Sequence, residues 1–436
     1  MVSQNESVPK TGLPSHSDMA LNNDEKANYY DFQSFLNIMR NPKAEPIVKY
    51  TKSFIRNFLT QKLNWTTAEQ EKLINDFKLF IYDKLTTNEA FKDLSESELQ
   101  NAKEGIEKLV MSKLYTRCFS PLLMEDKRCL ESTHEQDIID DTKLSEKILE
   151  FRFLKPEHLD ILPSLINAKL INFIMLSGKE LSKINNYRSP RDKIVCVLNS
   201  CKVLFGILKH NKKADGGADH FVPLLIFTLL KSDVDYLVSN VRYIERFRFP
   251  DFLTGESAYY LSTLQGAIKF ILDMDKTSIS VLESDEEFEN KYNANQEEIK
   301  VLKQQKRAKS QVNILQASKN EAPSTHVMSP SPSGLILKPL DDAANSVISK
   351  INEFWTATTS QESPTTPTSN GEDNQEIDEH TATALAQQME QKEHDNTLKT
   401  LQLMFPDLDP DLIQDVCIAS KYRVGVCVDA LLELVG

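Results

Sequence analysis

The sequence predicts an all-α protein of several domains, and three observations support this prediction. Glycine accounts for only 12 of the 436 residues, well below the usual ~7%, which disfavours glycine-rich β-turns and Rossmann-type loops. Apolar residues recur at spacings of three and four over much of residues 28–283, which is the period of an amphipathic helix. A nearly continuous apolar run from Phe221 to Leu230 indicates a helix that is buried on all sides at the centre of a domain.

The N-terminal part of the chain divides into an arm and a helical bundle. Residues 1–27 are polar and patternless, so we expect a disordered arm. Four apolar stripes follow within residues 28–139, and they predict a bundle of helices with the stripes as its core. The stripes are Phe32, Phe35, Leu36 and Met39; Phe54, Phe58, Leu59 and Leu63; Phe77, Phe80, Ile81 and Leu85; and Ile106, Leu109, Val110 and Leu114. Nothing in these stripes requires a ligand.

Residues 140–283 form a second predicted helical region, with the run from Phe221 to Leu230 at its centre. A glycine turn places Asp219 at the start of that helix. Taken alone, an Asp at such a position is most simply an N-cap, whose carboxylate accepts hydrogen bonds from the first amides of the helix. Pro223 is expected near the first turn, where a missing N–H costs little because the amides there lack helix partners.

Residues 284–395 are predicted to be a linker. The first part, 284–311, is charged and could form an exposed helix, whereas residues 356–378 are rich in Ser, Thr, Pro and Glu and cannot bury enough surface to offset the entropy lost on ordering. An amphipathic stripe lies within residues 340–355. It could dock on a partner or a membrane, fold back on the second helical region, or be a transient helix.

Residues 396–436 are predicted to form three short helices. Asp409 and Pro410 have the pattern of an N-cap followed by proline at the first helical position. About forty residues can build only a small core, so Met404, Phe405 and Leu432 could be core residues or surface contacts.

The composition excludes several classes of function. A net charge of −13 argues against a nucleic-acid partner, because phosphate binding needs clustered Lys and Arg. No run of about 20 apolar residues could span a bilayer and the N-terminus is polar, so we expect a soluble intracellular protein. The six Cys form no CxxC pair and the eight His lack zinc-finger spacing. With no GxxxxGK[ST] loop either, we expect no metal, no cofactor and no nucleotide hydrolysis by this chain.

Four short segments together resemble the catalytic domain of the vacuolar protein sorting nine family, whose members are guanine-nucleotide exchange factors for early-endosomal (Rab 5 class) GTPases. The segments are Arg188 to Lys193, Gly216 to Phe227, Ser239 to Ile244, and Thr254 to Ser262. The resemblance covers about residues 28–283 and identifies 140–283 as an exchange domain.

The end of the chain resembles a CUE domain, which is a small ubiquitin-binding bundle. The matching residues are Met404, Phe405 and Pro406 together with Asp429, Ala430, Leu431 and Leu432. This resemblance implies that Met404, Phe405, Pro406, Leu431 and Leu432 contact the apolar patch of ubiquitin.

The family resemblance also implies a mechanism. A GTPase holds its nucleotide through Mg²⁺, a lysine in its phosphate loop and backbone amides, and an exchange factor must replace those contacts. Asp219 would enter the nucleotide site and pair with that lysine, while Tyr259 would hydrogen-bond the switch region. Pro223, Ser262 and Asn240 would contact the GTPase, with Ser262 where the family usually has Thr; both hydroxyls can donate, so this departure is mild.

The implied partners are an early-endosomal Rab GTPase and ubiquitin or ubiquitinated cargo. The implied location is the cytoplasm, with recruitment to endosomes and at most peripheral membrane association. The implied activity is nucleotide exchange without covalent chemistry. One alternative is a non-catalytic adaptor that binds Rab and ubiquitin, and another is a helical scaffold; the presence of both Asp219 and Tyr259 favours exchange.

Overall fold

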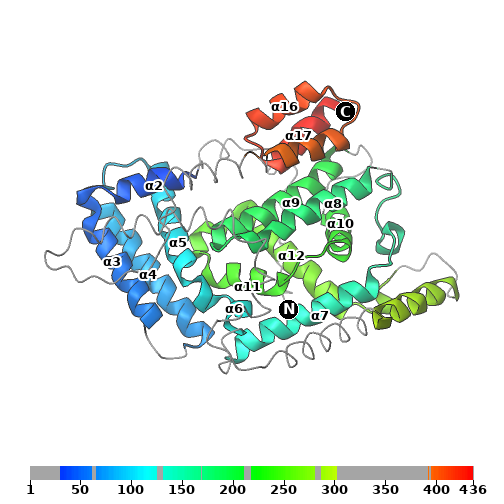
Figure 1. The fold of residues 1–436 in the computed structure, drawn as a ribbon, viewed down its shortest axis with the longest axis horizontal. Coiled ribbons are helices and arrows are strands. Elements are labelled where there is room, and N and C mark those ends of the chain that lie inside the picture. The colour runs from blue at the N-terminus through cyan, green and yellow to red at the C-terminus, as the bar shows by residue number, and fades with distance from the viewer. Residues whose placement is uncertain are drawn as a thin grey trace, which may run out of the picture.

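The computed structural model describes residues 30–60, 65–124, 131–167, 169–210, 218–279, 286–301, 391 and 394–435. Every regular element among these residues is a helix, which confirms the predicted fold class. Figure 1 shows an N-terminal bundle beside a second helical body, with the C-terminal helices above the latter. The predicted arm and the linker segments 340–355 and 356–378 lie outside the described residues.

The N-terminal bundle is built from four main helices with strong local start signals. They are α2 (Phe32–Met39), α3 (Glu45–Thr60), α4 (Thr67–Thr87) and α5 (Glu96–Cys118). Thr66 with Glu69, and Ser95 with Glu98, form capping boxes that satisfy the first amides of α4 and α5. The predicted stripes form or pack against the core, except that Leu63 lies outside the described residues and Phe80 is 41% exposed, with its ring edge-on to that of Tyr50 at 5.2 Å.

The predicted boundary between the bundle and the second body falls inside a helix. A short α6 (Ser120–Met124) precedes α7 (Ser132–Phe151), and the domain boundary predicted between residues 139 and 140 falls within α7. The buried carboxylate of Asp137 on α7 accepts hydrogen bonds from Arg242 at 2.9 Å and from Arg246 at 2.6 and 2.8 Å. One helix therefore spans the predicted boundary.

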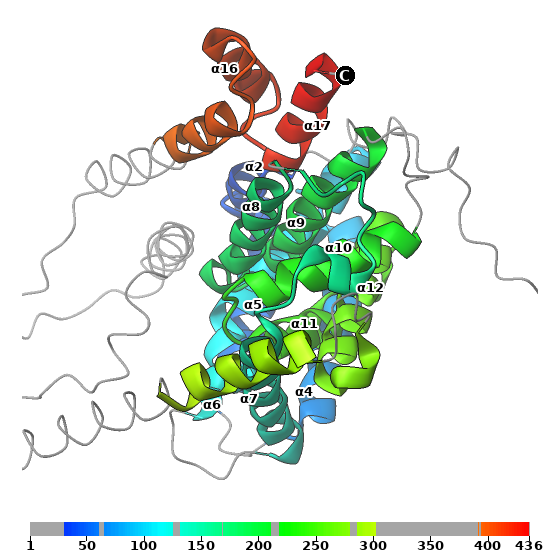
Figure 2. The same ribbon diagram turned by 90° about the vertical axis from the view of Figure 1, so that its right-hand side faces the viewer.

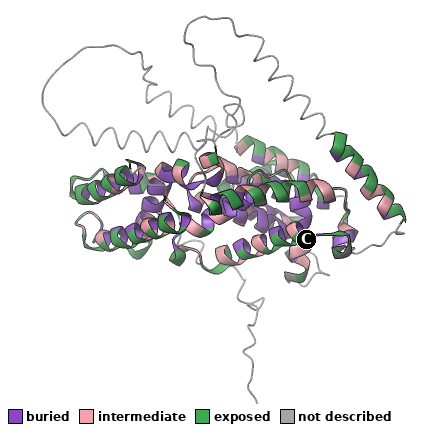
Figure 3. Ribbon diagram, turned by 90° about the horizontal axis from the view of Figure 1, so that it is seen from below, coloured by how far each residue is buried: buried purple, intermediate pink, exposed green. Residues whose placement is uncertain are grey.

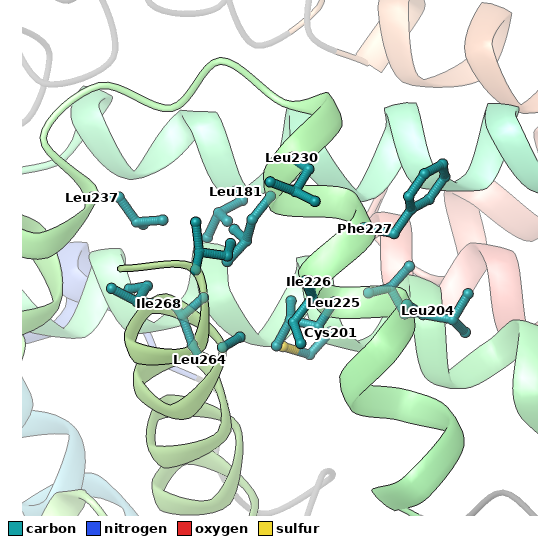
Figure 4. Packing of buried hydrophobic residues seen from close by; sticks show 14 of the residues in the cluster. Leu181, Cys201, Leu204, Leu225, Ile226, Phe227, Leu230, Leu237, Leu264 and Ile268 are labelled. Carbon is teal, nitrogen blue, oxygen red and sulfur yellow. The ribbon is translucent and has the colours of Figure 1, made fainter. Parts of the chain in front are cut away.

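The second body surrounds a central helix. Its main elements are α8 (Leu170–Ser182), α9 (Pro190–His210), α10 (Ala218–Lys231), α11 (Leu237–Phe247) and α12 (Gly255–Asp273). Phe221, Leu224 and Leu225 of α10 are fully buried, as the apolar run predicts. Figure 4 shows side chains of α10 facing those of α9 and α12, and Figure 3 shows that the buried residues lie along the middle of the molecule.

Part of the predicted linker belongs to the folded body. Residues 286–301 form a helix, and its Asn295 side chain donates hydrogen bonds to the carbonyl oxygens of Leu149 and Glu150 at 3.1 and 2.8 Å. Phe288 is buried, with its ring 5.6 Å from that of Phe153. The charged composition hid this contact, because a few apolar residues on one face suffice to dock a helix.

The C-terminal tail, residues 394–435, contains the three predicted helices. They are residues 394–404, α16 (Pro410–Ala419) and α17 (Val424–Val435). The Asp409 carboxylate accepts a hydrogen bond from the backbone N–H of Asp411 at 3.0 Å, which is the predicted cap. Figure 2 shows this tail lying on α8 and α9.

No helix among the described residues has the length and apolar character needed to cross a membrane. No group of three or more His, Cys, Asp or Glu side chains among the same residues is arranged to hold a metal ion.

Candidate functional site

Asp219 lies in the first turn of α10. Because the helix begins at Ala218, Asp219 is its second residue and not its N-cap. A carboxylate in this position is stabilised by the positive end of the helix dipole. The side chain is exposed, and none of the described residues donates a hydrogen bond to it. The structure therefore presents an exposed carboxylate in the first turn of α10.

Pro223 lies one turn beyond Asp219 on the same face of α10. This position is past the first turn, which corrects the expectation that Pro223 lies where a missing N–H costs little because the amides lack helix partners. In a regular helix the N–H of residue 223 would donate to the carbonyl oxygen of Asp219, and proline has none. The backbone carbonyl of Asp219 thus loses its helix donor, and Pro223 is half-buried beside it.

Tyr259 lies near the start of α12. Gly255 opens this helix with a φ of +54°, a left-handed conformation that glycine adopts easily. Tyr259 follows about one turn later and is half-buried. Burial raises the pKa of the Tyr259 hydroxyl, so the group remains protonated and able to donate at neutral pH. The exposed Ser262 donates a hydrogen bond to the Tyr259 carbonyl oxygen at 2.9 Å.

The starts of α10 and α12 are held next to each other. The ring of Phe221 lies 5.7 Å from that of Tyr260 and 6.3 Å from that of Phe205 on α9. Asp219 and Tyr259 are each within two residues of this aromatic contact. The structure thus brings both predicted catalytic residues to one end of the second body, next to an aromatic cluster of the buried Phe221 and Tyr260 and the half-buried Phe205.

An ion pair fixes the start of α12 from the side. The ammonium of Lys202 on α9 lies 3.1 Å from the carboxylate of Glu256, in the first turn of α12. Because Glu256 is three residues before Tyr259, this contact helps to set the position of the tyrosine.

Asn240 is in a different environment from the one predicted. It is fully buried on α11, where its side chain accepts a hydrogen bond from Lys193 at 2.6 Å and donates to Asn185 at 2.8 Å. A partner cannot touch a side chain with no exposed surface, so the prediction of direct GTPase contact is corrected to an internal role. Asn240 holds the Lys193 ammonium, and burial lowers the pKa of that lysine to about 7.

The segment from Arg188 to Lys193 joins the bundle to the second body. The Asp192 carboxylate accepts a hydrogen bond from the hydroxyl of Ser189 at 2.8 Å and pairs with Lys108 of α5 at 3.0 Å. The Lys193 ammonium lies 3.2 Å from the hydroxyl of Tyr115, also on α5. These residues hold the start of α9 against α5 and do not line the site.

The predicted ubiquitin-binding residues gather where the tail meets α8 and α9. Met404, Phe405 and Leu431 are buried, Leu432 is half-buried and Pro406 is exposed. The Phe405 ring lies 6.1 Å from that of Phe173 on α8. These side chains are therefore close together, but much of their surface is covered.

The surface on α8 and α9 that receives the tail was not predicted from the sequence. This surface consists of Phe173, Leu176 and Val203. A signal was present, because residues 201–208 of α9 are apolar on both faces, apart from Lys202. A helix with two apolar faces must be covered on both sides, and the second cover is the tail.

The comparisons with known sequence families match three parts of the chain. Residues 175–276 match the Vacuolar sorting protein 9 (VPS9) domain, and residues 394–435 match the CUE domain. Residues 49–115, in the N-terminal bundle, match a domain of unknown function. The two resemblances predicted from the sequence are thereby confirmed.

Several curated proteins are similar to this chain over 58–65% of its length. Vacuolar protein sorting-associated protein vps901 of Schizosaccharomyces pombe is 42% identical over 65% of this chain and 47% of its own length. Vacuolar protein sorting-associated protein 9A of Arabidopsis thaliana is 36% identical over 59% of this chain and 47% of its own. The Rab5 GDP/GTP exchange factor of Homo sapiens is 27% identical over 58% and 49%.

The chain spans about half the length of these relatives. It combines a VPS9 domain with a C-terminal CUE domain, and vacuolar protein sorting-associated proteins of a fungus and a plant are its homologues.

Proposed function

We propose that this protein is a guanine-nucleotide exchange factor for a Rab GTPase of the Rab5 class. The observation that carries the proposal is that Asp219, with an exposed carboxylate, and Tyr259 lie at the adjacent starts of α10 and α12. A VPS9 domain covers both residues, and a human relative is named a Rab5 GDP/GTP exchange factor.

Asp219 acts as a substitute for the phosphates of the bound nucleotide. Its carboxylate pairs with the lysine of the phosphate loop and disfavours Mg²⁺, so the nucleotide loses both of its main cationic contacts. The missing N–H at Pro223 supports this role, because it removes the helix donor that would otherwise bond to the Asp219 carbonyl oxygen beside the partner. A 10⁴-fold acceleration requires a barrier lower by only about 5.5 kcal/mol, which one buried charge pair and a few hydrogen bonds can supply.

Tyr259 and Ser262 hold the switch region of the GTPase in an open position. The half-buried ring of Tyr259 gives its hydroxyl a fixed direction. Pro223 shapes the surface on which the switch rests. The reaction makes no covalent bond, so all catalysis comes from binding the nucleotide-free GTPase more tightly than the nucleotide-bound form.

The tail binds ubiquitin through Met404, Phe405, Pro406, Leu431 and Leu432, and it recruits the protein from the cytoplasm to endosomes that carry ubiquitinated cargo. A three-helix module offers a small interface, near or below ~1,200 Å², so we expect weak binding. The CUE match supports this assignment.

Release of a fluorescent GDP analogue from a panel of purified Rab GTPases tests the exchange activity. Asp219→Asn keeps the shape of the side chain and removes its charge, so we expect exchange to slow by about 100-fold or more. Asp233→Asn is the matched control, because Asp233 is an exposed carboxylate just beyond the other end of α10. Near-normal exchange by Asp219→Asn would exclude the phosphate-substitute role.

The same assay separates exchange from the adaptor alternative. An adaptor would bind the GTPase without accelerating nucleotide release, and Asp219→Asn would leave its binding unchanged. An exchange factor accelerates release, and the substitution weakens its complex with the nucleotide-free GTPase.

A further inference from the structure

The C-terminal tail and the VPS9 domain share one apolar core. Leu176 of α8 and Val203 of α9 contribute to it from the VPS9 domain, and Phe173 of α8 contributes from just before that domain. The tail side consists of Leu401, Met404, Phe405, Ile413, Cys417, Val424, Cys427, Val428 and Leu431. Figures 1 and 2 show from two directions that α17 lies beside α9. The tail is therefore packed on the VPS9 domain in this form of the chain.

Two glycines allow α9 and α17 to approach closely. A Cβ atom at Gly206 would lie 3.4 Å from a methyl carbon of Leu432 and 3.7 Å from one of Val428. On α17, a Cβ atom at Gly425 would lie only 2.9 Å from the Cβ of Lys202 on α9. Lys202, Gly206 and Lys209 follow one another at helical spacing, so a single face of α9 carries the contact.

Ion pairs surround the apolar contact. The Lys209 ammonium lies 3.2 Å from the carboxylate of Asp429 and 3.1 Å from that of Glu433. At the other end, Lys169 lies 3.6 Å from Asp407. Such partly exposed pairs add little stability, but they set the orientation in which the tail docks.

The docked face overlaps the face assigned to ubiquitin. Phe405 contacts Phe173, and Leu432 faces Gly206. We propose that α8 and α9 occupy the ubiquitin-binding face of the tail, so that ubiquitin and the VPS9 domain compete for it. The chain then has a closed form, with the tail docked, and an open form that binds ubiquitin. This inference rests on the ubiquitin binding proposed above.

Competition has a measurable consequence for affinity. Only the open form binds ubiquitin, so the apparent dissociation constant equals that of the open form divided by the fraction of the chain that is open. If the closed form outnumbers the open form about tenfold, a variant that cannot close binds ubiquitin about tenfold more tightly. Ubiquitin in turn releases the tail.

Gly206→Arg in the full chain removes the closed form without altering the tail. The nearest atoms to a side chain at this position belong to Leu432 and Val428, so an arginine displaces the tail and leaves the packing of the VPS9 domain intact. Gly206→Ala is the conservative variant, because its Cβ fits at ordinary contact distance. Gly266→Arg is the matched control, since this helical glycine has no atom within 4 Å of its Cβ position.

Calorimetric titration with monomeric ubiquitin provides the first measurement. We expect Gly206→Arg to bind about tenfold more tightly than the wild-type chain, with Gly206→Ala and Gly266→Arg unchanged. Carbodiimide crosslinking provides the second, because it joins an amine and a carboxylate in direct contact. The wild-type chain should show an intramolecular link from Lys209 to Asp429 or Glu433, and saturating ubiquitin should abolish it.

The two measurements separate the possible failures. Equal affinity of all variants, with a link that persists at saturating ubiquitin, would overturn the competition and leave the proposed ubiquitin binding standing. A link without ubiquitin binding by any variant would overturn the ubiquitin assignment and the competition with it. Absence of the link from the free wild-type chain would show that the tail is not docked and would also overturn the inference.

Discussion

Tyr259 and Tyr260 are adjacent in sequence but have different environments. Tyr259 is half-buried at the start of α12, whereas Tyr260 is only 4% exposed and packs against Phe221. Tyr259→Phe removes one hydroxyl at the surface, and we expect exchange to slow by about 5-fold to 30-fold, which corresponds to about 1–2 kcal/mol. The thermal midpoint should not change. Tyr260→Phe is the internal comparison, and it should leave the exchange rate as it is; a larger loss with Tyr260→Phe would place the functional hydroxyl there.

Lys193 gives the stability of the protein a dependence on pH. Burial lowers the pKa of this lysine to about 7, although Asn240, Ile184 and Tyr115 supply oxygen atoms to its ammonium. Between about pH 7 and the unfolded pKa of about 10.4, the unfolded chain binds more protons than the folded chain, so stability rises with pH.

A comparison of Lys193→Met with the wild-type chain measures this contribution. From pH 7 to pH 9, the free energy of unfolding of the wild type should rise relative to that of the variant by on the order of 2 kcal/mol. Urea denaturation at several pH values gives the difference, in which the other titrating groups cancel. A constant difference between the two proteins would mean that the lysine remains fully charged in the fold.

The sequence predicts the environment of a side chain when its neighbours are close in the chain. It does not predict that environment when the neighbours come from distant parts of the chain. Asp219 and Tyr259 are marked by adjacent glycines and by the helix starts that follow them. Asn240 lies in an equally recognisable segment, yet its partners Lys193 and Asn185 come from more than 40 residues away. A motif identifies the residue, but only the packing shows whether its side chain faces inward.

At the scale of elements, local signals predicted which segments are helical but not what they pack against. The capping boxes at Thr66 and Ser95 and the apolar run of α10 are each formed by residues that are close together in the sequence. The docking of residues 286–301 on α7 depends on the match between two distant surfaces, which a single sequence does not reveal. A charged composition is compatible with an anchored helix when one face carries residues such as Phe288 and Asn295.

The anchored helix of residues 286–301 leads to a prediction about stability. Phe288→Ala removes a buried ring that packs on Phe153, so we expect a loss of about 3 kcal/mol in the free energy of unfolding. Val301→Ala is the control, because Val301 is 49% exposed in the same helix. Urea denaturation of the full chain measures both. Equal effects of the two substitutions would mean that this helix does not stabilise the second body.

At the scale of the whole molecule, the bundle and the VPS9 domain are linked by a buried charge network. Glu107 of α5 pairs with Lys78 of α4 at 3.1 Å and with Arg248, just after α11, at 2.7 Å. Its carboxylate also accepts a hydrogen bond from the backbone N–H of Phe249 at 2.8 Å. The core of the bundle includes Phe247 and Phe249, so neither body is complete alone.

Glu107→Ala tests whether the two bodies unfold together. The substitution leaves the buried ammonium of Lys78 without its carboxylate, although Arg248 keeps its pair with Glu104 at 2.7 Å, and we expect a loss of about 3–5 kcal/mol. Hydrogen exchange measured by mass spectrometry should show a similar loss of protection in α4 and in α11, because the network joins both. Loss confined to the bundle would show that the two bodies unfold independently.

The two contacts of Lys202 restrict which substitutions position 202 can tolerate. Its stem packs against Gly425 of the tail, and its ammonium pairs with Glu256 at the start of α12. A substitution at position 202 therefore alters the fit of the tail and the setting of Tyr259 at the same time. A substitution at position 202 cannot change one of these two contacts without changing the other. It will therefore need compensating substitutions on α12 or on the tail.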